Sequence, residues 1–75
     1  MDQKILTFAS VHHALKAEKM LRLKGIDIHV INTPREVSKD CGICLRFDEQ
    51  DEDRLIDAMK EKKAAYAGIY RIDYP

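Results

Sequence analysis

The sequence predicts an α+β fold, because two helical patterns are interleaved with four short strand patterns in the order β-α-β-β-α-β. The helical patterns repeat apolar residues at a spacing of about 3.6, and the strand patterns are apolar or alternating runs bounded by polar turns. This order is typical of the split βαβ, or ferredoxin-like, sandwich. We therefore expect a four-stranded antiparallel sheet in the strand order 4-1-3-2, with both helices on one face.

The first half of the chain supplies a strand, a helix and a second strand. Lys4–Phe8 is apolar on both faces, which predicts a central strand. Ser10 suits the N-cap of a helix over residues 11–24, since its hydroxyl can accept from a first-turn amide, and Gly25 suits the helix end. The alternating run 26–30 predicts a half-buried strand. The helix stripe expected to face the sheet contains Val11, Ala14, Ala17 and Leu21, with Met20 beside it.

The second half supplies two strands around a second helix. Pro34 cannot donate to a strand ladder, so the second strand ends before it and a polar loop follows. Acidic residues over 48–53 suit the first turn of the second helix, and the run 67–74 predicts the last strand. The inward face of the third strand is expected to contain Ile43, Leu45 and Phe47. The buried stripe of the second helix is expected to contain Leu55, Ile56 and Met59.

Length and charge restrict the class of protein. The 75 residues suffice for one small domain, which we place at residues 1–75. The thirteen basic and thirteen acidic side chains cancel, which argues against a nucleic-acid binder. No apolar run is long enough to span a membrane, and the N-terminus lacks a signal-peptide pattern. We therefore expect a cytoplasmic protein whose two cysteines are thiols.

A Cys-Gly pair stands at positions 41 and 42, where the polar loop turns into the third strand. In the predicted topology the first and third strands are antiparallel neighbours, so the start of the first helix and Cys41 should lie at one end of the sheet. A helix N-terminus and nearby cations stabilise a thiolate, which is the nucleophilic form of cysteine. Gly42 would let a partner's backbone approach this thiol closely. The residues expected to gather there are Ser10, His12, His13, Arg35, Lys39 and Cys41.

Nearly the whole chain contributes to a family resemblance, through the stretches Thr7–Lys19, Thr33–Ser38, Cys41–Ile43, Leu45–Phe47 and Gly68–Tyr70. Together these stretches resemble the selenium/sulfur carrier protein-like family of small bacterial proteins. The resemblance implies that one cysteine holds sulfur or selenium as a persulfide or selenosulfide. By motif, that cysteine is Cys41.

The resemblance also implies protein partners: a sulfur or selenium donor such as a cysteine desulfurase, and an acceptor protein. A carrier needs no turnover of its own, so whether the protein is an enzyme stays open. We expect no cofactor and no metal, and a monomer or weak homodimer. Cys44 stands where we expect a small apolar residue in relatives. The residues expected to support Cys41 are Gly42, His13, Arg35, Ser10 and Cys44.

Residues 41–44 also form a C-x-x-C motif, and whether its thiols form a redox pair stays open. A strand that starts at Cys41 would put the two side chains on opposite faces and hinder a disulfide, whereas a loop through Gly42 would permit one. A zinc site is not expected, because His12 and His13 lie about 100° apart on a helix and no second C-x-x-C is present.

A different class of function is a non-catalytic interaction or regulatory module. In that hypothesis the sheet face opposite the helices pairs with a second copy or with another protein. The face would contain Lys4 or Ile5, Cys44, Arg46 and the last strand.

Overall fold

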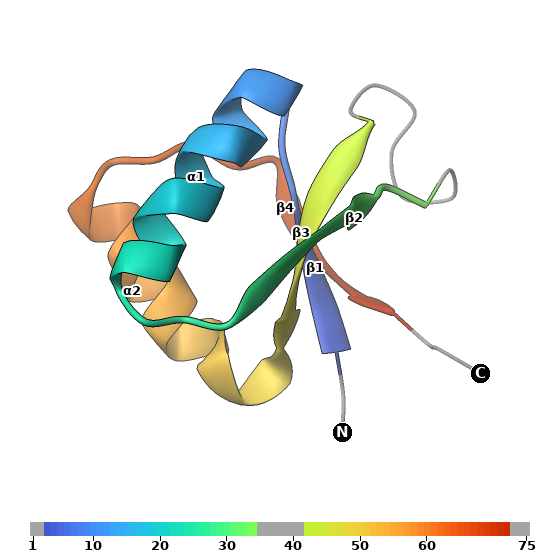
Figure 1. Ribbon diagram of the computed structural model, residues 1–75. Coiled ribbons are helices and arrows are strands. Elements are labelled where there is room, and N and C mark those ends of the chain that lie inside the picture. The colour runs from blue at the N-terminus through green and yellow to red at the C-terminus, as the bar shows by residue number, and fades with distance from the viewer. Residues whose placement is uncertain (1–2, 35–41, 73–75) are drawn as a thin grey trace.

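The computed structural model describes residues 3–34 and 42–72, which form a four-stranded sheet with two α-helices on one face (Figure 1). The elements in chain order are β1 (Gln3–Thr7), α1 (Val11–Leu23), β2 (Ile28–Asn32), β3 (Ile43–Asp48), a 3₁₀ turn (Glu49–Asp51), α2 (Glu52–Glu61) and β4 (Gly68–Ile72). The sheet order is β2-β3-β1-β4, and every neighbouring pair is antiparallel. This confirms the predicted α+β ferredoxin-like fold and its strand order. No helix in these two ranges is long and apolar enough to cross a membrane.

The central strands β1 and β3 define the two faces of the sheet. Leu6 pairs with Leu45 on the face that carries the helices, whereas Ile5 pairs with Arg46 on the opposite face. Ile5 and Leu6 are both fully buried, as expected for a strand predicted to be central. The core between sheet and helices contains Leu6, Phe8, Ala14, Ala17, Leu21, Ile26, Ile28, Leu45, Phe47, Leu55, Ala58 and Met59.

Val11 lies elsewhere than the sequence predicts, and the structure decides between Lys4 and Ile5 for the open sheet face. Val11 is assigned to the buried stripe of α1 but is 45% exposed, because it belongs to the first turn, which extends beyond the end of β1 (Figure 1). Lys4 lies on the helix face, since it pairs with Phe47, so Ile5 and not Lys4 belongs to the open face. The ammonium group of Lys4 forms an ion pair with Glu52 at the start of α2.

The C-terminal end of α1 is closed by a Schellman motif. Gly25 has a left-handed φ of 78°. Its amide donates to the Arg22 carbonyl at 3.0 Å, and the Ile26 amide donates to the Leu21 carbonyl at 3.1 Å. This confirms Gly25 as the end of the helix. It also explains why β2 begins at Ile28 and not at Ile26, since the Ile26 amide is already bonded to the helix.

The C-terminal end of α2 has the same hydrogen bonds without a glycine. The Lys63 amide donates to the Lys60 carbonyl at 3.1 Å, and the Ala64 amide donates to the Met59 carbonyl at 2.9 Å. Lys63 occupies the position that Gly25 occupies after α1, and its φ is 54°. A left-handed conformation is strained for any residue with a Cβ atom. A lysine at this position therefore makes the fold less stable than a glycine would.

A glycine placed at the end of α2 and a glycine removed from the end of α1 should change the free energy of unfolding in opposite directions. Lys63→Gly should raise the free energy of unfolding by about 0.5–1 kcal/mol, because it relieves the left-handed backbone. Gly25→Ala should lower it by about 1 kcal/mol, since a Cβ there meets no atom of the described residues within 4 Å and only the backbone is strained. Urea denaturation of both variants measures the changes. A loss of stability in Lys63→Gly would contradict this account of the α2 end.

The ends of the two helices are joined by an ion pair. The Lys24 ammonium donates to both carboxylate oxygens of Glu61, at 3.0 and 3.1 Å. The hydrogen bond and the charge of Lys24 lower the pKa of Glu61 below its ordinary value of 4.5. A carboxyl group whose pKa is lowered by folding stabilises the fold above its unfolded pKa. That stabilisation is lost as the pH falls through the folded pKa.

Removing the cation should therefore raise the pKa of Glu61. In Lys24→Gln we expect the pKa to return toward 4.5, because the first two causes of its lowering are gone. A carboxyl-detected NMR titration of the wild type and the variant measures both values. Lys19→Gln is the matched control, since Lys19 is exposed on α1 and no ion pair to it is found among the described residues. Equal pKa values of Glu61 in the wild type and Lys24→Gln would contradict the assignment.

Candidate functional site

Three strand ends meet at one end of the sheet, beside Gly42. β1 ends and β3 begins there, because the two strands are antiparallel neighbours. β2 also ends there, since Asn32 pairs with Ile43 and the Thr33 amide donates to the Gly42 carbonyl at 3.1 Å. α1 begins shortly after β1, so its N-terminus lies at the same end. The start of the first helix and the start of the third strand therefore lie at one end of the sheet, as predicted.

Ser10 caps the N-terminus of α1, as predicted. Its backbone is extended, with φ −151° and ψ 160°, and its hydroxyl accepts from the His13 amide at 3.4 Å. The same hydroxyl lies 2.7 Å from Nδ1 of the His13 ring. The first turn of α1 contains no acidic side chain. The positive end of the helix dipole is therefore not neutralised by carboxylates of its own first turn.

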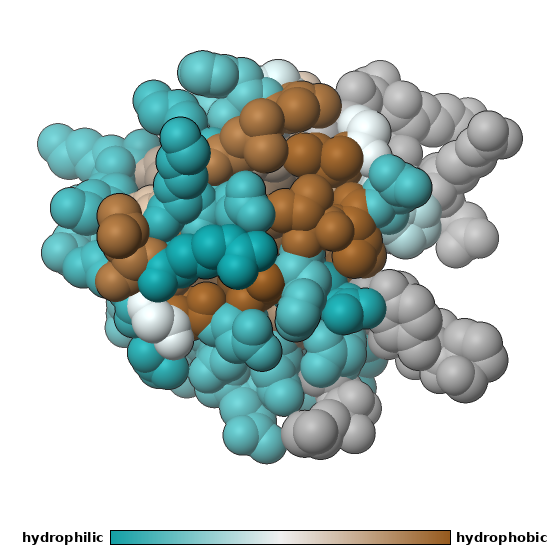
Figure 2. All heavy atoms as spheres, in the orientation of Figure 1, coloured by the Kyte–Doolittle hydropathy of each residue, from teal (hydrophilic) through white to brown (hydrophobic). Residues whose placement is uncertain are grey.

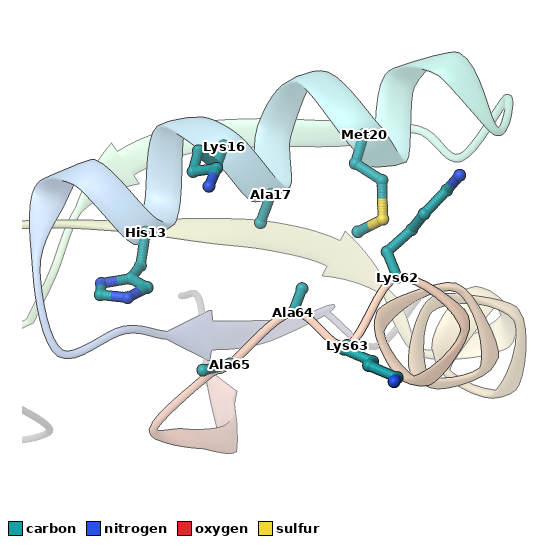
Figure 3. Close-up of a pocket in the computed structure, with 8 residues that line it drawn as sticks. All are labelled: His13, Lys16, Ala17, Met20, Lys62, Lys63, Ala64 and Ala65. Atoms are coloured by element: carbon teal, nitrogen blue, oxygen red, sulfur yellow. The ribbon is translucent and has the colours of Figure 1, made fainter.

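The side chain of His13 projects from α1 toward the segment that joins α2 to β4 (Figure 3). It lines a groove there with Ala64 and Ala65. His12 is exposed, and its ring centroid lies 6.1 Å from that of His13 at an angle of 74°. Within the described residues, no group of three or more His, Cys, Asp or Glu side chains could hold a metal ion.

Gly42 is an exposed residue. A Cβ atom built on it would meet no atom of the described residues within 4 Å. Close by, the Thr33 hydroxyl oxygen is buried and has no hydrogen-bond partner among the residues that the structure describes. Sequence patterns did not single out Thr33, because a threonine before a proline is ordinary at a strand end. Its hydroxyl can donate to an acceptor at this end of the sheet.

Cys44 lies on the sheet face opposite the helices, as predicted, but it is fully buried. It pairs with Ile31 of β2, and one further step of the β1–β3 register sets it across from Thr7. A buried cysteine behaves as a small apolar residue, and its thiol has little access to reagents in solution. Cys44 therefore packs within the sheet.

Several predicted site residues lie outside the described part of the chain. These are Cys41, Arg35 and Lys39. The structure brings Ser10 and His13 together and sets Gly42 at the same end of the sheet. The assignment of Cys41 as the reacting residue, with Arg35 beside it, stays a prediction.

An exposed apolar surface borders this end of the sheet. Figure 2 shows hydrophobic side chains along the start of α1 and on the strands beside it. Val11 and Leu15 on α1 are each 45% exposed, and Val30 on β2 is 37% exposed. Leu15 carried a signal in the sequence, because it is an apolar residue off the buried stripe of its helix. Apolar patches of this kind often mark protein contacts.

The fold and this sheet end define a small ferredoxin-like α+β domain with an exposed glycine where its third strand begins. The chain belongs to the family described as Putative Se/S carrier protein-like, whose family model matches residues 3–71. This confirms the resemblance seen in the sequence, and the family name indicates carriage of selenium or sulfur, with contacts to other proteins. No curated protein and no solved structure matches the chain.

Loss of the Ser10 hydroxyl should destabilise α1. We expect Ser10→Ala to lower the free energy of unfolding by about 1 kcal/mol, because a first-turn amide loses its acceptor. Ser10→Asp, whose carboxylate can accept the same hydrogen bond, should retain most of the stability. Urea denaturation compares the three proteins, and equal stability of Ser10→Ala and the wild type would show that the cap contributes nothing.

Proposed function

We propose that the protein is a sulfur or selenium carrier that holds its cargo on Cys41. A donor such as a cysteine desulfurase supplies a sulfane sulfur, and an acceptor protein removes it. The observation that carries this proposal is membership of the Se/S carrier protein-like family over residues 3–71. Cys41 comes directly before Gly42 and lies in a stretch that resembles the family.

The proposed transfer is thiol–disulfide exchange at a persulfide. The Cys41 thiolate attacks the terminal sulfur of the donor persulfide and forms a new S–S bond. The donor's own S–S bond breaks, and the donor cysteine leaves as a thiolate. An acceptor nucleophile then attacks the terminal sulfur of Cys41–S–SH, and Cys41 leaves as a thiolate. No external oxidant or reductant is needed, because sulfane sulfur only moves between thiolates.

The described residues support an anion at this end of the sheet. The N-terminus of α1 carries a partial positive charge that its first turn does not neutralise. The Thr33 hydroxyl can donate a hydrogen bond, and the exposure of Gly42 permits the close approach of a partner. In this proposal the His13 imidazole offers a hydrogen bond and Arg35 adds positive charge.

The exposed apolar surface of Val11, Leu15 and Val30 supports contact with a donor or acceptor. A carrier must bind two proteins in turn, so a moderate surface beside the reacting residue is more useful than a large permanent interface. This surface borders the end of the sheet at which Gly42 lies.

The alternative is an interaction module that uses the open sheet face. Tyr70 is 43% exposed on that face, where it pairs with Ile5. Ile5 and Cys44 on the same face are fully buried, so they offer no surface to a partner. The carrier hypothesis is therefore favoured over pairing through this face.

Intact-mass measurement tests the carrier directly. After incubation with a cysteine desulfurase and cysteine, we expect the wild-type chain to gain the mass of one sulfur atom, and the gain should disappear on reduction. Cys41→Ser should show no gain. Cys44→Ala is the matched control and should load like the wild type, because the Cys44 thiol is buried.

A Cys41→Ser protein that still gains sulfur would remove Cys41 from the proposed role. Alkylation separates the two functional classes independently. Fast alkylation of Cys41 at neutral pH, relative to a free thiol such as glutathione, is expected for a carrier thiolate. Alkylation at the rate of an ordinary thiol, together with no sulfur gain, would favour the interaction module.

A further inference from the structure

A groove of about 420 Å³ runs between α1 and the segment 62–65 that follows α2. Its volume lies within the range of about 300–1,000 Å³ that is usual for small-molecule sites. In Figure 3 Ala17 and Ala64 point toward each other across the groove, with His13 at one end and the side chains of Met20 and Lys62 at the other. The groove is lined by His13, Lys16, Ala17, Met20, Lys62, Lys63, Ala64 and Ala65.

The interior of the groove is suited to a flat apolar group. Its walls carry the methyl groups of Ala17, Ala64 and Ala65, which leave room between the helix and the facing segment. Met20 adds a thioether, which adapts its shape and contacts aromatic rings favourably.

The charged groups around the groove are all basic. Lys16 stands on one wall, and Lys62 and Lys63 stand on the other. Among the described residues, no carboxylate forms an ion pair with any of these three lysines. Glu18 pairs with Arg22. Glu61 pairs with Lys24, and the charge of Lys62 also acts on Glu61, so Lys16 and Lys63 are the groove lysines on which neither of these carboxylates acts. A positive surface of this kind is complementary to an anion.

Helix stability accounts for only part of this placement of charge, because the helix dipole favours Lys62 and Lys63 at the C-terminal end of α2 but not the basic residues of α1. Lys16 and His13 belong to the N-terminal half of α1, where cations gain nothing from the helix dipole. The last carbonyls of α2 already accept from the amides of Lys62, Lys63 and Ala64. Lys63 also holds a left-handed φ of 54° in a position where glycine would be unstrained. Local strain of this kind often accompanies a binding site.

We propose that this groove binds a small organic anion, composed of a flat apolar body that carries a phosphate or carboxylate group. The apolar body lies between Ala17 and Ala64 and against Met20. The anionic group lies at the mouth of the groove, whose rim carries the positive charges of Lys16, Lys62 and Lys63. This function does not use Cys41, although His13, which the carrier proposal assigns to the support of Cys41, also lines the groove.

An NMR titration of the full ¹⁵N-labelled chain tests the proposal. The probes are 1-naphthyl phosphate and 1-naphthoate, which share the ring and separate the two anionic groups. Neutral 1-naphthylmethanol tests the ring alone, and inorganic phosphate tests the charge alone. We expect saturable shifts in residues 13–20 and 62–65 with at least one of the two ring anions. Each of the two single-feature probes should bind at least about tenfold more weakly, because charge-assisted contacts and apolar burial both contribute.

Two double variants that remove the same number of positive charges distinguish binding in the groove from non-specific attraction to the protein surface. Lys16→Gln with Lys62→Gln should weaken the ring anion at least about tenfold. Lys19→Gln with Lys60→Gln should leave binding within about twofold of the wild type, because these exposed lysines of the same helices do not line the groove. Lys63→Gly should weaken binding while the fold becomes more stable. A folding defect would instead lower binding and stability together. Cys41→Ser should bind like the wild type.

The proposal is overturned if neither ring anion gives saturable shifts in the groove. It is also overturned if 1-naphthylmethanol binds as tightly as the anions, or if the Lys16→Gln, Lys62→Gln protein binds like the wild type. Shifts confined to the sheet face around Arg46 and Tyr70 would likewise assign the binding to another surface.

Discussion

The antiparallel pairing of β1 with β3 is the contact on which the rest of the structure depends. These two strands are the centre of the sheet, and every other element is placed relative to them. Their register sets Leu6 and Leu45 toward the helices. It also brings the start of α1 to the end of the sheet at which β3 begins. A shift of one residue in this pairing would turn the apolar face of β3 away from the core.

Much of the fold could be predicted because its signals are local. The period of the apolar residues separates helices from strands, and the order of the elements then leaves few topologies. Ser10 and Gly25 could be assigned because an N-cap hydroxyl and a left-handed helix end each favour particular residue types. The strand ends beside Gly42 could be brought together from topology alone.

The features that could not be predicted arise from contacts between distant segments. The spacing of Val11 from the other apolar residues of α1 predicts burial. It is exposed because the first turn of the helix extends beyond the end of the sheet. Lys4 belongs to a strand, yet its ammonium group reaches a carboxylate at the start of α2. The groove forms because Ala17 and Ala64 face each other, and the periodicity of a sequence does not predict the spacing between two distant segments.

The pairing of Gln3 with Ile72 has a practical consequence. β1 begins beside the residue at which β4 ends. This end of the sheet is remote from Gly42, because Gln3 pairs with Asp48 at the end of β3, whereas Gly42 precedes the start of β3. A tag or reporter domain fused before Gln3 or after Ile72 would therefore be attached on the side away from the loop–strand junction. Immobilisation through either fusion would leave that junction pointing outward.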